Sequence, residues 1–240
     1  MPEPTPTSTA PPAPWLPHAA PFAAYMGFIA LEQLLEAAAG VVPELETIAT
    51  GDHLWLYPLK ILVVIGLLWG FRRHYVELIR PLRPLRDWPL AVAVGAAVFL
   101  LWINMDWPFA TQGRAEGYNP HAAGLSAGLT AALIGVRLFG AAVVVPVFEE
   151  LFWRSFLMRY LVHRDFTRVP MGTLTPVAFG ATCLLFGLEH HLWLAGMMAG
   201  AAYAGLLAVT RNLPTVILAH GVTNLMLGLW VLNTGQWRFW

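Results

Sequence analysis

The stretch VVVPVFEELFWRSFLMRY, residues 143–160, places two glutamates and two arginines inside a largely apolar run. Such a run is typical of a helix that crosses a lipid bilayer, because only a helix or a closed barrel satisfies its backbone polar groups there. A charged side chain at the bilayer centre costs about 2.5–3.5 kcal/mol, even on the lower insertion scale. Charges kept at this cost mark a functional site, so the stretch predicts a membrane helix with a site in it.

The composition of the whole chain also indicates a membrane protein. Of its 240 residues, 58% are hydrophobic and 12% are charged, and the mean hydropathy is +0.60. Soluble domains carry about 25% charged residues, so this balance predicts a polytopic membrane protein. Basic and acidic residues number 14 each, and without a basic excess we expect no nucleic-acid partner. The single cysteine, Cys183, excludes an intrachain disulfide and is expected to be a small buried apolar residue.

The apolar segments predict an all-α fold. We expect seven transmembrane helices, or eight if the long fourth segment divides. About 17–25 residues suit one span, so the fourth segment must either kink at Pro146 or continue as an interfacial helix. The seven segments cover residues 22–42, 54–71, 88–103, 125–162, 175–190, 192–209 and 213–232.

Four regions are predicted along the chain. Residues 1–21 are rich in proline and are expected to form a disordered arm, which lacks the basic stretch of a cleavable signal peptide. The first apolar segment should therefore remain as an anchor. A first transmembrane region follows at 22–124, a second one with the candidate site at 125–232, and a short tail at 233–240.

The loops predict the orientation in the membrane. Five arginines lie in residues 72–87, whereas residues 43–53 contain three acidic residues and no lysine or arginine. The positive-inside rule places 72–87 in the cytoplasm and 43–53 outside. The expected location is a bacterial cytoplasmic membrane.

Four charged residues lie in apolar segments outside the main motifs. Lys60 is near a segment end, where its side chain can reach the interface. Glu32 and Glu36 are one turn apart on a shared helical face. The two glutamates could line a polar cavity, pair with Lys60 or Arg137, or sit near the interface. Arg137 is the fourth of these charged residues, and a structural role is favoured for all four.

The first motif separates the roles of two adjacent glutamates. Glu150 and Arg154 are four residues apart and can pair on one helical face, whereas Glu149 is turned by about 100°. Arg154 could then hold one carboxylate while the other points into a cavity. An isolated motif of this form would more often be a helix N-terminus or an interfacial salt bridge.

Two further motifs contain histidines. Phe186-Gly187-Leu188-Glu189-His190 is followed by a second histidine, His191, and adjacent side chains cannot both face one cavity. Glu189 is a candidate partner for the histidine that does.

The last motif, His220-Gly221-Val222-Thr223-Asn224, places its histidine and its asparagine on one helical face. Two hydrogen-bond donors there could stabilise an oxyanion. Hydrogen bonding between membrane helices is the alternative.

Together these motifs resemble the CAAX-protease and bacteriocin-processing (Abi) family of intramembrane proteases, which are similar to type II CAAX prenyl endopeptidases. That family carries EExxxR, FxxxH and HxxxN/D motifs on successive membrane helices, and residues 125–232 match them without departure. The resemblance implies that His190, rather than His191, is functional. Residues 57–60 and 71–75 also resemble CAAX-protease-related proteins of bacterial exosortase systems, which implies an exosortase as a partner.

The resemblance implies hydrolysis of a peptide bond in a membrane-associated or lipid-modified protein. Glu149 and His190 would activate water, and His220 and Asn224 would stabilise the oxyanion. Glu150 and Arg154 would hold the first motif in place. No cofactor is favoured, although Glu149, His190 and His220 could bind a divalent metal such as zinc.

Two other functions stay open. One is a non-catalytic immunity or assembly factor that keeps the scaffold of the family. The other is a small ion-coupled transporter, against which the lack of an internal repeat argues.

Overall fold

The computed structural model describes residues 13–39, 53–83, 85–113 and 117–240, and throughout these residues its regular structure is helical. The predicted all-α class is confirmed for this part of the chain. Its α-helices are α1 (Leu16–Ala39), α3 (His53–Phe71), α4 (Asp87–Trp102), α5 (Ala127–Phe139), α6 (Val145–Glu150), α7 (Met158–Tyr160), α8 (Pro176–Leu188), α9 (Trp193–Thr210) and α10 (Leu213–Thr234).

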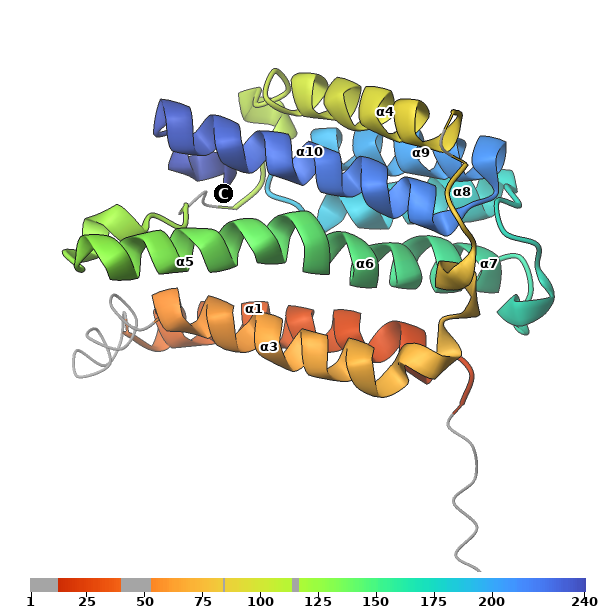
Figure 1. Cartoon of the computed structure of the whole chain (residues 1–240), viewed down its shortest axis with the longest axis horizontal. Coiled ribbons are helices and arrows are strands. Elements are labelled where there is room, and N and C mark those ends of the chain that lie inside the picture. Colours follow the sequence, from red (N-terminus) through yellow and green to blue (C-terminus); the bar gives the residue numbers. More distant parts are fainter. Residues whose placement is uncertain (1–12, 40–52, 84, 114–116) are drawn as a thin grey trace, which may run out of the picture.

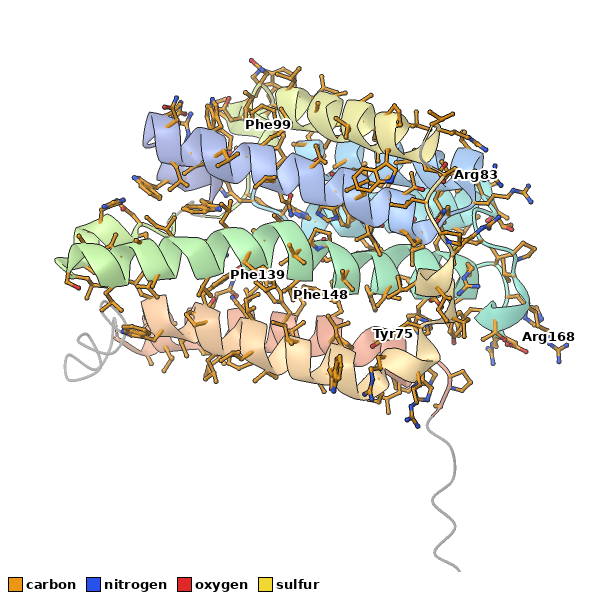
Figure 2. The ribbon with its side chains drawn as sticks, in the orientation of Figure 1. Tyr75, Arg83, Phe99, Phe139, Phe148 and Arg168 are labelled. Atoms are coloured by element: carbon orange, nitrogen blue, oxygen red, sulfur yellow. The ribbon has the colours of Figure 1, made fainter. Side chains whose placement is uncertain are left out.

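The helices form two groups with one long helical segment between them (Figure 1). Helices α1 and α3 pack against each other on one side of this segment. On the other side, α10 packs against α4, and α8 packs against α9. Many large apolar side chains are exposed on the helices, among them Trp69, Leu100 and Val177, and Figure 2 shows the side chains of the described residues as sticks.

The long segment is the predicted fourth one, and it does not divide. Helices α5, α6 and α7 are joined by two π-helical stretches, η6 (Gly140–Val144) and η7 (Leu151–Leu157), so the helix runs from Ala127 to Tyr160. Pro146 directly follows η6. A proline ring clashes with the carbonyl four residues earlier, and the wider turn of a π-helix relieves that clash.

Within the described ranges, four helical stretches are long and apolar enough to cross a membrane: Leu54–His74, Ala127–Tyr160, Trp193–Thr210 and Leu213–Thr234. Two shorter apolar helices are Asp87–Trp102 and Pro176–Leu188. These stretches support an integral membrane protein. The count of seven or eight transmembrane helices stays a prediction.

The N-terminal boundary differs from the expected one. Helix α1 begins at Leu16, six residues before the start of the predicted first segment, so the last residues of the predicted arm are helical. Residues 1–12 of that arm lie outside the described residues, as does most of the acidic loop at 43–53.

Buried polar contacts connect α1 to the rest of the molecule. Lys60 on α3 pairs with Glu32 on α1 at 3.2 Å, which is one of the roles left open for these residues. The side chain of Glu36 lies outside the described residues. Near the other end of α1, His18 lies 2.8 Å from the Glu77 carboxylate, which also accepts a hydrogen bond from Ser155 on η7.

Close backbone packing positions α10. A Cβ atom at Gly95 on α4 would lie 2.5 Å from the carbonyl oxygen of Ala219 and 2.8 Å from the Cβ of Val222 on α10. Thr223 donates a hydrogen bond of 2.9 Å to the Gly95 carbonyl at the same crossing. Small residues allow membrane helices to approach this closely, and here they set the position of the helix that carries the third motif.

Candidate active site

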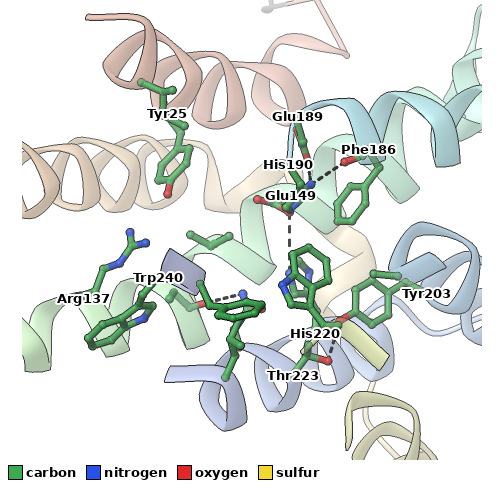
Figure 3. A pocket seen from close by; sticks show the side chains of 18 of the residues that line it. Tyr25, Arg137, Glu149, Phe186, Glu189, His190, Tyr203, His220, Thr223 and Trp240 are labelled. Carbon is green, nitrogen blue, oxygen red and sulfur yellow. Dashed lines mark hydrogen bonds and ion pairs between the residues drawn. The ribbon is translucent and has the colours of Figure 1, made fainter. Parts of the chain in front are cut away.

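The three motifs face one cavity of about 230 Å³ in the interior of the bundle. Glu149 comes from α6, His190 from the turn after α8, and His220 and Asn224 from α10 (Figure 3). The cavity is otherwise walled mainly by aromatic and aliphatic side chains. Its lining also includes Tyr25, Trp102, Arg137, Phe186, Glu189, Tyr203, Phe239 and Trp240.

The two adjacent glutamates have different surroundings. Glu150 is fully buried outside the cavity lining, and its Oε1 accepts hydrogen bonds from Arg154 Nη1 at 3.1 Å and from His220 Nδ1 at 2.9 Å. Glu149 lines the cavity, and its buried Oε2 has no hydrogen-bond partner among the described residues. The helical geometry thus keeps one carboxylate in the packing and turns the other towards the cavity.

Arg154 is held behind the cavity. Besides its ion pair with Glu150, it donates from Nη2 to the Gly200 carbonyl on α9 at 3.5 Å. Its guanidinium also lies over the Phe186 ring, 4.3 Å from the ring centroid. Arg154 therefore links the first motif to α8 and α9 without lining the cavity.

The orientation of His220 follows from its partner. The Glu150 carboxylate can only accept, so Nδ1 of His220 carries the hydrogen and Nε2 points towards Glu149, with 3.9 Å to its Oε2. The ring stacks on Tyr203 with 4.9 Å between centroids. The 3.9 Å between His220 Nε2 and Glu149 Oε2 is too long for a direct hydrogen bond and is compatible with a bridging water.

His190 and His191 face different surroundings. Helix α8 ends at Leu188, two residues earlier than the predicted segment, so both histidines lie in the following turn. His190 lines the cavity and donates from Nδ1 to the Phe186 carbonyl at 2.7 Å. His191 instead contacts the Gln112 backbone carbonyl and lines a separate, smaller pocket.

Asn224 connects α10 to the first π-helical stretch. Its Nδ2 donates to the carbonyl of Ala141 in η6 at 2.8 Å. Asn224 also lines the cavity, where its other N–H can point towards a ligand. The third motif thus combines the two roles weighed from the sequence, contact between helices and a donor at the cavity.

One group of side chains could hold a metal ion. Ligand atoms of Glu149, Glu189 and His190 all lie within 4.8 Å of one another. The set differs from the expected one in a single member, because Glu189 takes the place of His220. Glu149 and Glu189 each have one buried carboxylate oxygen without a partner among the described residues, and two carboxylates with an imidazole suit a divalent cation.

The sequence reasoning missed the position of two charged residues in the cavity. Glu189, considered only as a partner for a histidine, lines the cavity and accepts a hydrogen bond of 3.1 Å from the Trp153 indole. Arg137 lines it as well. The available signal was an arginine in the same apolar segment as Glu149, but no spacing rule connects the two.

The model of the Rce1-like family of type II CAAX prenyl endopeptidases matches residues 131–226. That range includes all six residues singled out from the three motifs. No curated protein and no solved structure gives a significant match to the chain. The match suggests a CAAX-type intramembrane protease, and the apolar helices fit a membrane-embedded substrate.

Proposed function

We propose that the chain is an intramembrane endopeptidase that hydrolyses a peptide bond in a membrane-associated or lipid-modified protein. The observation that carries this proposal is the convergence of the three motifs on one cavity, with the Glu149 carboxylate turned into it and unpartnered among the described residues. A buried carboxylate next to two imidazoles is suited to proton transfer with water.

The geometry supports a separate role for each of these residues in the reaction. Glu149 takes a proton from the attacking water, and His190, fixed by the Phe186 carbonyl, holds that water. Asn224 directs an N–H at the oxyanion that forms on the scissile carbonyl, and His220 can do so from Nε2 once its ring is protonated, because Nδ1 already donates to Glu150. Glu150 sets the ring orientation of His220, and Arg154 balances the buried charge of Glu150.

We favour metal-independent chemistry. A divalent cation such as zinc would be held by Glu149, Glu189 and His190, and it would act as a Lewis acid towards water. The two mechanisms differ in their response to chelators. Metal-independent cleavage persists in a chelator, whereas cleavage that needs the cation is lost and returns when the metal is restored.

The test uses the full chain in liposomes with a quenched fluorescent apolar peptide as reporter. Glu149→Gln should lower the cleavage rate by about 10²–10⁴-fold, because it keeps the shape of the side chain and loses proton acceptance. Asp165→Asn is the matched control, since this exposed carboxylate pairs only with neighbours in its own loop. Cleavage that continues at the wild-type rate in Glu149→Gln would refute the proposed base.

The orientation of the chain in the membrane, the kind of membrane and the partner are also proposals. The arginine-rich residues 72–87 support a cytoplasmic position for that loop, in a bacterial cytoplasmic membrane. The resemblance of residues 57–60 and 71–75 supports an exosortase system as the partner. An exosortase gene beside the gene for this chain would strengthen this assignment, and genes of an unrelated system there would count against it.

A further inference from the structure

The turn that carries His190 lies beyond the end of its helix. Helix α8 ends at Leu188, so the positions of His190 and His191 are not set by a helical face. The last carbonyl groups of a helix have no donors within the helix and need partners from elsewhere. The groups that supply those donors therefore decide how the turn lies and which ring enters the cavity.

Gln112 supplies them from the loop that follows α4. Its side-chain Nε2 donates to the carbonyl oxygen of Leu188 at 2.7 Å and to that of His190 at 3.0 Å. One amide nitrogen carries two hydrogens, so both of its donors are used in these bonds. The backbone N–H of Gln112 donates to the His191 carbonyl at 2.9 Å, and its own carbonyl accepts from Nδ1 of His191. One residue thus binds the turn through both its side chain and its backbone.

These bonds leave His190 as the ring that faces the cavity. Nδ1 of His190 donates to the Phe186 carbonyl at 2.7 Å (Figure 3), and the ring meets Trp102 edge to face, with 5.3 Å between centroids. Nε2 is then free to accept a hydrogen bond from water. Gln112 itself is exposed and is not among the residues that line the cavity, so it acts on the site only through the turn.

The loop that carries Gln112 has other attachments. Ala110 is fully buried, and the Trp193 indole at the start of α9 donates to the Phe109 carbonyl at 3.3 Å. Loss of the Gln112 side chain should therefore leave the loop and the fold in place. What the side chain adds is the pair of donors to the turn.

We propose that Gln112 is a positioning residue that holds His190 in the cavity through its amide N–H groups. This inference rests on the proposed function and adds to it a residue outside the three motifs. A misplacement of about 1 Å in a catalytic group can cost about 10²-fold in rate, so a small shift of the turn should be measurable.

The kinetic test uses the full chain in liposomes with the reporter peptide. Gln112→Glu keeps the length of the side chain but replaces both N–H donors by an acceptor. It should lower kcat about 10–100-fold and leave KM within about twofold, because the residue does not touch the peptide. Gln112→Lys restores a donor of sufficient length and should recover much of kcat.

Asn104→Ala is the matched control. Asn104 is also exposed, and its side-chain amide also donates to a backbone carbonyl near the end of a helix, that of Leu100 at 2.7 Å. That bond does not involve the His190 turn, so the control should keep the wild-type kcat and KM. Elution of each variant as a single peak shows that it is folded.

A second measurement does not depend on cleavage. Diethyl pyrocarbonate acylates accessible imidazole nitrogens, and tandem mass spectrometry distinguishes His190 from His191. The exposed His163 serves as the internal reference in each sample. The rate at His190 relative to that at His163 should rise severalfold in Gln112→Glu, because the ring is released from the cavity, and should stay at the wild-type value in Asn104→Ala.

Three results would overturn the proposal. They are an unchanged His190 acylation rate in Gln112→Glu, a rise in KM without a fall in kcat, and a Gln112→Glu protein that does not fold, which would give the amide a purely structural role. If the wild type cleaves nothing, the proposed protease function fails, and the acylation rates alone decide whether Gln112 positions His190.

Discussion

The adjacent residues Glu149 and Glu150 show how one helical step separates two chemical roles. The Glu150 carboxylate is fully buried and accepts hydrogen bonds from two donors. Glu149 reaches the cavity with a carboxylate oxygen that lacks a hydrogen-bond partner among the described residues. The ion pair between Glu150 and Arg154 is the contact on which the first motif depends, because a buried charge is costly unless it is paired.

Arg154→Ala should therefore destabilise the protein and reduce its activity. Removing one partner of a buried ion pair costs about 3–5 kcal/mol, because the remaining charge is left uncompensated. The folded fraction after detergent extraction, measured by size-exclusion chromatography, should fall clearly below that of the control Arg164→Ala. An Arg154→Ala protein that is monodisperse and fully active would contradict this role.

At the residue scale, the sequence predicted the main contact within the first motif but not the full set of residues that line the cavity. The i,i+4 spacing correctly gave the pairing of Glu150 with Arg154. It could not choose between His190 and His191, because α8 ends at Leu188 and the following turn, not a helical face, decides which ring enters the cavity. It also could not place Arg137, whose role in the wall depends on rings from three distant parts of the chain.

At the scale of elements, the crossing of α4 and α10 fixes the third motif. Gly95 allows the two backbones to approach so closely that any side chain there must displace α10. The apolar pattern predicted both helices, with ends within two residues of those found. It did not predict which helices would touch, since the outer and inner faces are equally apolar.

Gly95→Ala should lower both stability and activity. Overpacking of a tight contact typically costs about 1–3 kcal/mol, and here the displaced helix carries His220 and Asn224. Gly66→Ala on α3 is the matched control, because a Cβ there meets no atom within 4 Å. The control should be neutral or slightly stabilising, since alanine is the better helix former. Thermal unfolding in detergent and the reporter assay measure the two effects, and equal behaviour of both variants would refute the packing argument.

At the scale of the whole molecule, a polar cluster joins α1, the segment after α3 and the long helix. Glu77 accepts hydrogen bonds from His18 and Ser155, and Arg159 binds Ser155 and the Val169 carbonyl on the other side. Burial alone would raise the pKa of the Glu77 carboxyl, but these hydrogen bonds outweigh it and hold the pKa below its usual value. Distant segments are thus held together by one carboxylate.

The stability of the assembly should consequently depend on pH in the acidic range. Because the pKa of Glu77 is lower in the folded state than in the unfolded state, its stabilising contribution is complete above the unfolded value. That contribution is lost as the pH falls through the folded value. The melting temperature of the wild type in detergent should therefore fall more steeply below about pH 4.5 than that of Glu77→Gln. Parallel melting curves for the two proteins would show that Glu77 carries no such linkage.

The π-helical stretch η7 has a consequence for how this chain can vary in length. A π-helical turn accommodates about one residue more than an α-helical turn, and η7 separates Glu149 and Glu150 from the part of the helix that holds Arg159. Loss of one residue in η7 after Arg154 could be absorbed by tightening η7 into an α-helix, with the pair of Glu150 and Arg154 kept at its i,i+4 spacing. The same loss inside α10, between His220 and Asn224, would turn the asparagine by about 100° away from its present direction. A gap is therefore tolerable just after the first motif and disruptive inside the third, although both positions lie on helices.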